Sequence, residues 1–172
     1  MQKLFKKLAI LLVAVVAVLG ITAFATACED NSVTYATEGS EITVIVKDEN
    51  GNRIDGTTFG GFYDVDTDAI IPMPVGVQFC SVVTNSDTGL GLCADMKQLS
   101  ATGEVKFTYD EIKRCVENTK NSNSYDAEYV TGEVELHVTY VEDRGYEASY
   151  GKYHIDRFPS TITVTLKLAS NG

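Results

Sequence analysis

Near its C-terminus the chain alternates between apolar and polar residues in two separate stretches. In the first, Val134, Leu136 and Val138 alternate with polar side chains. The second, from 161 to 168, repeats the scheme with Ile162 and Val164 among its apolar positions. A period of two is typical of β-strands that have one buried and one solvated face. We therefore expect antiparallel strands whose apolar sides meet in one core.

A single helix interrupts this pattern of strands. Thr108 followed three residues later by Glu111 has the form of a capping box, and Ile112, Cys115 and Val116 form an apolar stripe at helical spacing. The sequence predicts a helix over about 109–119. With the strand spacing elsewhere, this indicates an all-β fold, an antiparallel immunoglobulin-like β-sandwich with one short helix.

The first 27 residues have the composition of an export signal. Three lysines precede an unbroken apolar run from Leu8 to Leu19, and Ala25-Thr26-Ala27 is a small-x-small cleavage pattern. Cys28 follows directly, which resembles a bacterial lipoprotein box and makes Cys28 the candidate lipidation site, although Ala25 stands where that box usually has Leu. Plain secretion is the alternative, and an uncleaved membrane span comes third.

After residue 27 we expect a tether over 28–40 and a single domain over 41–170. The part after residue 27 contains 11 basic and 24 acidic side chains, a formal charge of −13, because three of the chain's 14 basic residues precede it. Such a charge disfavours nucleic acid and anionic lipid headgroups as partners. The expected partner is a protein or glycan on the extracytoplasmic side, with the membrane contacted only through the signal or lipid anchor.

Four cysteines allow three pairings if Cys28 is free. We expect the disulfide Cys80–Cys93, because the two residues flank the turn-rich stretch 85–89 and would lie opposite each other in a hairpin. Cys115 is expected to pack as a small buried apolar residue, unless it captures one of that pair.

Two segments resemble a known group of proteins. The stretch EITVIVKDENGNRIDGTTFGGF, residues 41–62, and the segment Gly103-Glu104-Val105-Lys106-Phe107 are similar to the opening hairpin and the Gly-x-Val-x-Phe strand of prealbumin-like surface modules. That group includes carboxypeptidase regulatory-like and collagen-adhesin B-type domains. The resemblance implies a β-sandwich used as a spacer, stalk or adhesive unit on bacterial surfaces.

Two further clusters are candidate binding sites. Asp64, Asp66 and Asp68 recur at a spacing of two and share one face of an extended chain, so we consider a calcium ion there as the only possible cofactor. Ala69 and Val75 stand where the EF-hand calcium loop needs Gly and Glu. Tyrosine offers a flat apolar ring with a polar tip, and the candidate binding surface is therefore a tyrosine-rich patch, formed by Tyr146, Tyr150, Tyr153 and His154.

Catalytic motifs are absent from the sequence. It contains no Gly-x-Ser-x-Gly elbow, no phosphate-binding glycine loop ending in Lys, and no His-x-x-x-His pair. The expected function is a non-enzymatic binding or structural module, exported and either lipid-anchored to the outer face of the cytoplasmic membrane or secreted. The alternative is a secreted inhibitor or accessory subunit of an extracellular enzyme. A hydrolase built from Ser149, His154 and Asp156 ranks below both.

Overall fold

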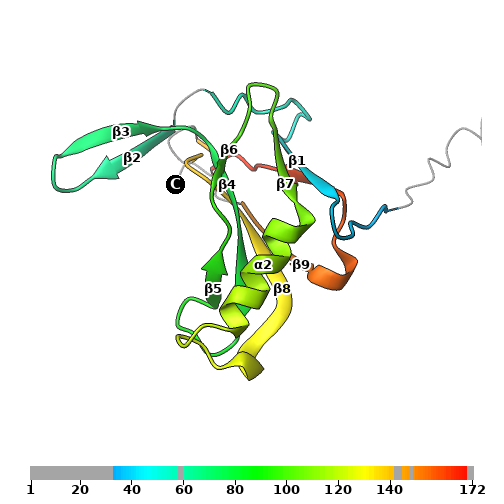
Figure 1. The fold of residues 1–172 in the computed structure, drawn as a ribbon. Coiled ribbons are helices and arrows are strands. Elements are labelled where there is room, and N and C mark those ends of the chain that lie inside the picture. Colours follow the sequence, from blue (N-terminus) through cyan, green and yellow to red (C-terminus); the bar gives the residue numbers. More distant parts are fainter. Residues whose placement is uncertain (1–32, 58–59, 142–144, 148, 170–172) are drawn as a thin grey trace, which may run out of the picture. The chain divides into compact units, whose positions relative to one another are not determined.

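The computed structural model describes residues 33–57, 60–141, 145–147 and 149–169 (Figure 1). The predicted signal peptide and Cys28 lie outside these residues. The described part is an all-β sandwich with one α-helix, as the alternation predicted. The strands lie in a three-stranded sheet, a larger sheet and a separate hairpin. In chain order they are β1 (Glu41–Lys47), β2 (Gly60–Asp64), β3 (Ala69–Met73), β4 (Gly76–Val83), β5 (Leu90–Cys93), β6 (Lys97–Gln98), β7 (Glu104–Thr108), β8 (Val130–Thr139), β9 (Ser149–His154) and β10 (Thr161–Thr165).

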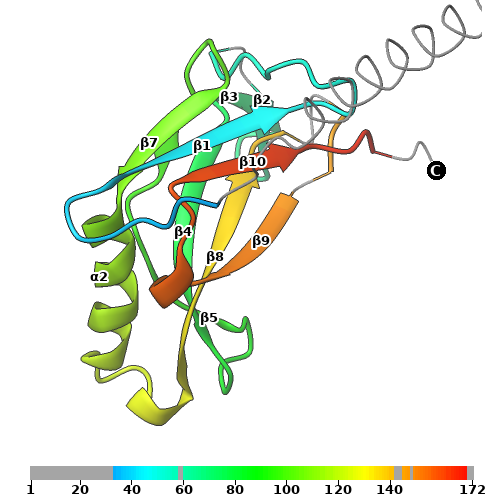
Figure 2. The ribbon, with the colours of Figure 1, turned by 90° about the vertical axis from the view of Figure 1, so that its right-hand side faces the viewer.

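The three-stranded sheet has β1 at its centre, between β10 and β7 (Figure 2). The β1–β7 ladder is antiparallel, whereas β1 and β10 run parallel, with Val44 opposite Ile162. This ladder corrects the expectation of a purely antiparallel sandwich. A parallel pair needs a long crossover, and here most of the domain lies between the two strands in sequence.

The expected opening hairpin after β1 is reduced to a turn. Asp48 accepts hydrogen bonds from the backbone N–H groups of Asn50 and Asn52, and the chain makes one isolated bridge from Lys47 to Arg53. Gly51 has a φ of 82°, which favours glycine. The returning segment therefore forms no strand partner for β1, because β7 and β10 already occupy both of its edges.

The larger sheet has the order β5-β4-β8-β9, and β6 also pairs with β4. Its apolar face packs against the three-stranded sheet. The ring of Phe79 on β4 lies 5.0 Å from that of Phe107 and 5.5 Å from that of Phe158, both measured between centroids. Burial of one such side chain contributes about 1.5–3 kcal/mol. Most of the alternating residues are confirmed as core: Val134, Leu136, Val138, Ile162, Val164 and Leu166 are buried. Leu168, at the end of the second stretch, is 60% exposed, because β10 ends at Thr165.

The helix α2 (Tyr109–Lys120) closes one end of the sandwich, beside β4, β5 and β8. The predicted capping box is present: the Thr108 side chain accepts from the N–H of Glu111, whose side chain accepts from the N–H of Thr108. The helix buries a stripe that includes Ile112, Cys115 and Val116. Two short 3-10 turns, η1 (Ala127–Tyr129) and η3 (Ile155–Arg157), lead into β8 and β10.

The predicted tether of residues 28–40 does not match the structure over its last part. The N–H of Ala36 donates to the carbonyl of Phe158, and that of Ser160 donates to the carbonyl of Thr34, around a bridge from Tyr35 to Pro159. Ala36 is buried. The domain therefore begins at Thr34 rather than at residue 41, because backbone pairing with the segment before β10 holds the chain in place.

Candidate functional site

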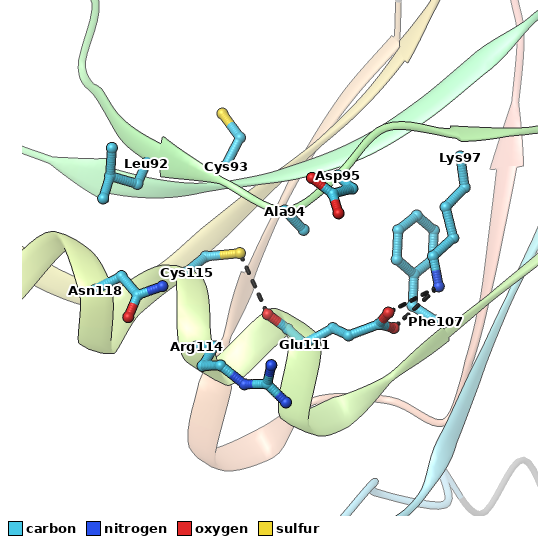
Figure 3. Close-up of a pocket in the computed structure, with 10 residues that line it drawn as sticks. All are labelled: Leu92, Cys93, Ala94, Asp95, Lys97, Phe107, Glu111, Arg114, Cys115 and Asn118. Carbon is cyan, nitrogen blue, oxygen red and sulfur yellow. Dashed lines mark hydrogen bonds and ion pairs between the residues drawn. The ribbon is translucent and has the colours of Figure 1, made fainter.

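A groove runs between α2 and the segment that links β5 to β6 (Figure 3). Its volume is about 290 Å³. The helix wall consists of positions 111, 114, 115 and 118, which share one helical face. The opposite wall is the stretch 92–95 with Lys97, and Phe107 of β7 lines one end.

The strand wall is held in place by contacts to β4 and to the helix. Cys80 and Cys93 lie opposite each other in the β4–β5 ladder and form the predicted disulfide. The N–H of Leu92 donates to the Thr119 hydroxyl at 2.9 Å, which connects β5 to the helix. A Cβ at Gly91 would lie 2.5 Å from both the Thr119 Cγ2 and the Ser81 Oγ, so this close approach favours glycine.

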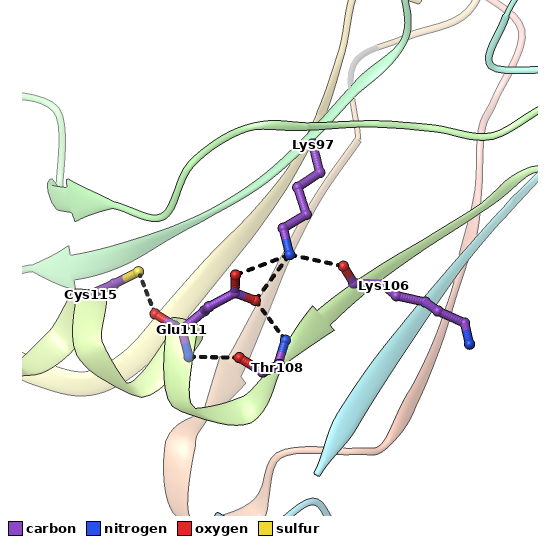
Figure 4. Close-up of polar contacts among 5 residues, drawn as sticks. All are labelled: Lys97, Lys106, Thr108, Glu111 and Cys115. Atoms are coloured by element: carbon purple, nitrogen blue, oxygen red, sulfur yellow. Dashed lines mark hydrogen bonds and ion pairs between the residues drawn. The ribbon is translucent and has the colours of Figure 1, made fainter. Parts of the chain in front are cut away.

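Lys97 and Glu111 form an ion pair at one end of the groove (Figure 4). The Lys97 ammonium donates to both carboxylate oxygens of Glu111, at 3.0 and 3.1 Å, and to the carbonyl of Lys106 at 3.1 Å. It also lies 4.7 Å from the centroid of the Phe107 ring, a cation–π contact. The N–H of Thr108 and the ammonium of Lys97 hold the pKa of Glu111 below its usual value. The two charges compensate each other and fix the start of the helix.

Cys115 lies on the groove floor as a free, buried cysteine. Its thiol donates to the carbonyl of Glu111 at 3.4 Å. Burial raises the pKa of this thiol to about 11. At neutral pH the group is therefore an uncharged thiol, the inert form expected of a structural cysteine, and it agrees with the prediction of a small packed apolar residue.

Two charged side chains of the groove have no ion-pair partner among the residues that the structure describes. Arg114 on the helix and Asp95 on the strand segment are both exposed and make no hydrogen bond or ion pair to any residue that the structure describes. In Figure 3 they belong to opposite walls. Asn118, one helical turn beyond Arg114, likewise has an amide without a partner in the described part of the chain. The groove thus offers a cation, an anion and an amide to a ligand.

A second concave surface, which we call the seam, lies between β9 and β10. Two hollows of about 190 and 330 Å³ adjoin there and share Ser149, Tyr150 and Thr165. The chain pairs at one end of this seam, where Tyr146 bridges to Leu168. Beyond that bridge the two strands belong to different sheets, so an edge of each faces the seam.

The structure splits the predicted tyrosine-rich patch between two faces. Tyr150 is 61% exposed and meets His137 edge-on, with ring centroids 4.9 Å apart. Tyr153 turns inward and packs against Phe158, at 5.6 Å between centroids, and its burial raises the pKa of the phenol. Tyr146 is half-buried against the core. Tyr150 and Tyr153 both line the seam, from opposite sides of β9, and we keep them as candidate binding residues.

The two histidines have structural contacts. The exposed His154 accepts a hydrogen bond from the N–H of Asp156 and caps the turn η3. The His137 side chain is only 15% exposed, because Tyr150 and Glu135 cover it. Its Nε2 lies 3.1 Å from a Glu135 carboxylate oxygen without forming a hydrogen bond.

The predicted calcium residues lie in the turn between β2 and β3. Asp64 accepts hydrogen bonds from the N–H of Asp66 and the hydroxyl of Thr67, which lower the pKa of its carboxyl. Asp68 adopts a φ of 51°. The described residues contain no group of three or more His, Cys, Asp or Glu side chains placed to hold a metal ion. Calcium binding at Asp64, Asp66 and Asp68 stays a prediction.

Comparisons of the chain with protein-family models, with curated proteins and with solved structures each found no match. Among the residues that the structure describes, no helix has the length and apolar character needed to cross a membrane.

Proposed function

We propose that this chain is an exported, non-enzymatic binding or structural module. It is either anchored at the outer face of the cytoplasmic membrane through a lipid on Cys28 or secreted after cleavage before that residue. The disulfide Cys80–Cys93 carries the proposal. Disulfides form and persist in oxidising compartments outside the cytoplasm, and the export-like first 27 residues account for how the chain reaches one.

The contacts of the reactive side chains support a non-enzymatic role. The Cys115 thiol is buried and its pKa is raised, so it is a poor nucleophile. His154 accepts its hydrogen bond from a backbone N–H and caps a turn. The ammonium of Lys97 is held by three oxygen atoms. These groups stabilise the fold.

The seam between β9 and β10 is the surface that we assign to a protein or glycan partner. Tyr150 presents an exposed ring there, and Ser149, Thr163 and Thr165 line the same surface with hydroxyl side chains. Aromatic rings beside small polar side chains are frequent in recognition surfaces. The resemblance to adhesive and spacer modules points in the same direction.

One observation favours the alternative, a secreted inhibitor or accessory subunit. The β2–β3 hairpin forms a sheet of its own, and Val65 at its tip is 80% exposed between two aspartates. An apolar side chain at the tip of a hairpin that stands outside both larger sheets is available for contact with a partner. If this is the function, Val65→Asp abolishes co-purification with the partner enzyme, whereas Tyr150→Ala leaves it intact.

The test is an intact-mass measurement after expression in a bacterium with lipoprotein processing, combined with cell fractionation. We expect a mature chain that begins at Cys28, carries a lipid, lies in the membrane fraction and contains one disulfide. In the Cys28→Ala variant the lipid mass should disappear. An unlipidated secreted chain that begins at Cys28 supports the secreted form. An unprocessed, fully reduced chain in the cytoplasm would refute the proposal.

A further inference from the structure

The groove beside α2 has the size of a site for a small molecule. Its volume of about 290 Å³ falls just below the range of about 300–1,000 Å³ that is typical of ligand pockets. The ligand must therefore be smaller than a drug-sized molecule. Because one wall is a capped helix and the other is tied by the disulfide and the Leu92–Thr119 hydrogen bond, both walls are already in position.

The charges of the groove select the ligand. Lys97 and Glu111 neutralise each other and leave no net charge at their end of the groove. Arg114 and Asp95 have no ion-pair partner among the described residues and line opposite walls. A ligand that carries one positive and one negative group is complementary to this arrangement, whereas a ligand with a single charge leaves one of the two walls uncompensated.

The helix wall is suited to the negative group. Arginine presents a planar fork of N–H donors that matches a carboxylate. Asn118 lies four residues beyond Arg114, so its amide is on the same helical face and adds a further donor. On the opposite wall the Asp95 carboxylate accepts hydrogen bonds, as an ammonium group requires.

Between the charged walls the lining is uncharged. Leu92, which is 41% exposed, lines the groove together with Ala94 and the Cys115 thiol. A short aliphatic side chain would bury apolar area against these groups, at about 25 cal/mol per Å². A second charge on the ligand's side chain would find no partner there.

We propose that this groove binds a compact zwitterion, an α-amino acid with a small aliphatic side chain. Arg114 and Asn118 hold its carboxylate, and Asp95 holds its ammonium group. The inference goes beyond the proposed function, because it concerns a different surface from the β9–β10 seam and does not depend on the compartment or on lipidation.

The test is a titration of the purified protein with L-leucine, followed by NMR chemical shifts and by calorimetry. Two analogues each lack one charge: 4-methylpentanoate lacks the ammonium group and 3-methylbutylamine lacks the carboxylate. We expect saturable binding of L-leucine, and at least about tenfold weaker binding of each analogue, since one lost charge-assisted hydrogen bond contributes roughly that factor.

Two variants test which residue of the groove holds each charged group of the ligand. In Arg114→Gln, L-leucine should bind no more tightly than 3-methylbutylamine, which lacks the carboxylate. In Asp95→Asn, L-leucine should bind no more tightly than 4-methylpentanoate, which lacks the ammonium group. Arg157→Gln and Asp87→Asn make the same charge changes at exposed positions outside the groove, and should leave the affinity within about twofold of the original. The four substituted side chains are exposed, so the variants are expected to fold.

Three results would overturn the inference. One is no saturable shift with L-leucine up to roughly 10 mM, the weak end of small-ligand affinity. Another is equal affinity for L-leucine and both analogues. The third is a set of shifts centred on Tyr150 and Thr165, which would place the ligand in the seam. None of these outcomes bears on export or lipidation, so the two proposals fail independently.

Discussion

At the scale of single residues, side-chain contacts place the helix and the strand segment beside it. Thr108 ends β7 and begins α2, and Glu111 connects that helix start to Lys97 on the strand side of the groove. The polar end of the groove and the start of the helix therefore share one set of hydrogen bonds. A change at either residue should be measurable as a change in stability.

Substitution of the helix cap should destabilise the protein. In Thr108→Ala the N–H of Glu111 loses the hydroxyl that it donates to at 3.2 Å. We expect a loss of about 1 kcal/mol in the free energy of unfolding, measured by urea denaturation. Thr108→Ser keeps a hydroxyl at this position and should retain most of that stability. Equal stabilities of the alanine variant and the original protein would show that the cap is not used.

Glu111 should make part of the stability depend on pH. The backbone N–H of Thr108 and the ammonium of Lys97 hold the pKa of Glu111 below its ordinary value of 4.5. The ionised carboxylate therefore stabilises the fold fully above pH 4.5, and this stabilisation disappears as the pH falls through the lower folded pKa. The difference in unfolding free energy between the original protein and Glu111→Gln should be largest at neutral pH and shrink in acid. A difference that stays constant with pH would show that ionisation of Glu111 does not stabilise the fold.

At the scale of elements, the disulfide connects β5 to the central strand β4. The two cysteines are 13 residues apart. β5 lies at the edge of its sheet and is covered by the helix through Leu92 and Thr119. The pairing was predictable because the two cysteines flank a turn, and opposed positions in a hairpin are close enough for a disulfide.

Removal of the disulfide should lower stability by about 3 kcal/mol, the expected effect for a closed loop of this length. The Cys80→Ala, Cys93→Ala double variant should therefore unfold at a lower urea concentration. Addition of a reductant should move the original protein to a similar midpoint and leave the double variant unchanged. A reductant effect of equal size on both would assign the stabilisation to some other group.

At the scale of the whole molecule, one apolar layer joins the two larger sheets. Phe79 occupies its centre, in edge contact with Phe107 of the facing sheet and with Phe158 next to β10. The opposite face of the same large sheet carries Tyr150, which is 61% exposed. Two aromatic residues of one sheet therefore belong to different environments.

Alanine substitutions at the two residues should therefore lower the free energy of unfolding by different amounts. Phe79→Ala should cost about 3–5 kcal/mol in unfolding free energy, because it removes a buried ring and leaves a cavity. Tyr150→Ala should cost under about 1 kcal/mol, because its ring is mostly in water already. Thermal or urea unfolding measures both. A similar cost for the two substitutions would show that the Phe79 ring is not central to the core.

The sequence alone determined the local features of this protein. Three features follow from the spacing of residues that are near each other in sequence: the buried face of each alternating strand, the start of α2 at Thr108 and the Cys80–Cys93 pairing. This spacing sets which side chains share a face, or lie opposite each other, within a local element. The helix wall of the groove is likewise readable from helical spacing.

Only the tertiary structure decided which distant segments meet. The parallel pairing of β1 with β10, the docking of Thr34–Ala36 and the inward turn of Tyr153 depend on packing between residues far apart in sequence. The same holds for the groove, since Asp95 faces the helix only because the β4–β5 ladder brings its segment there. A periodic pattern states which face of an element is buried, but not which other element will cover it.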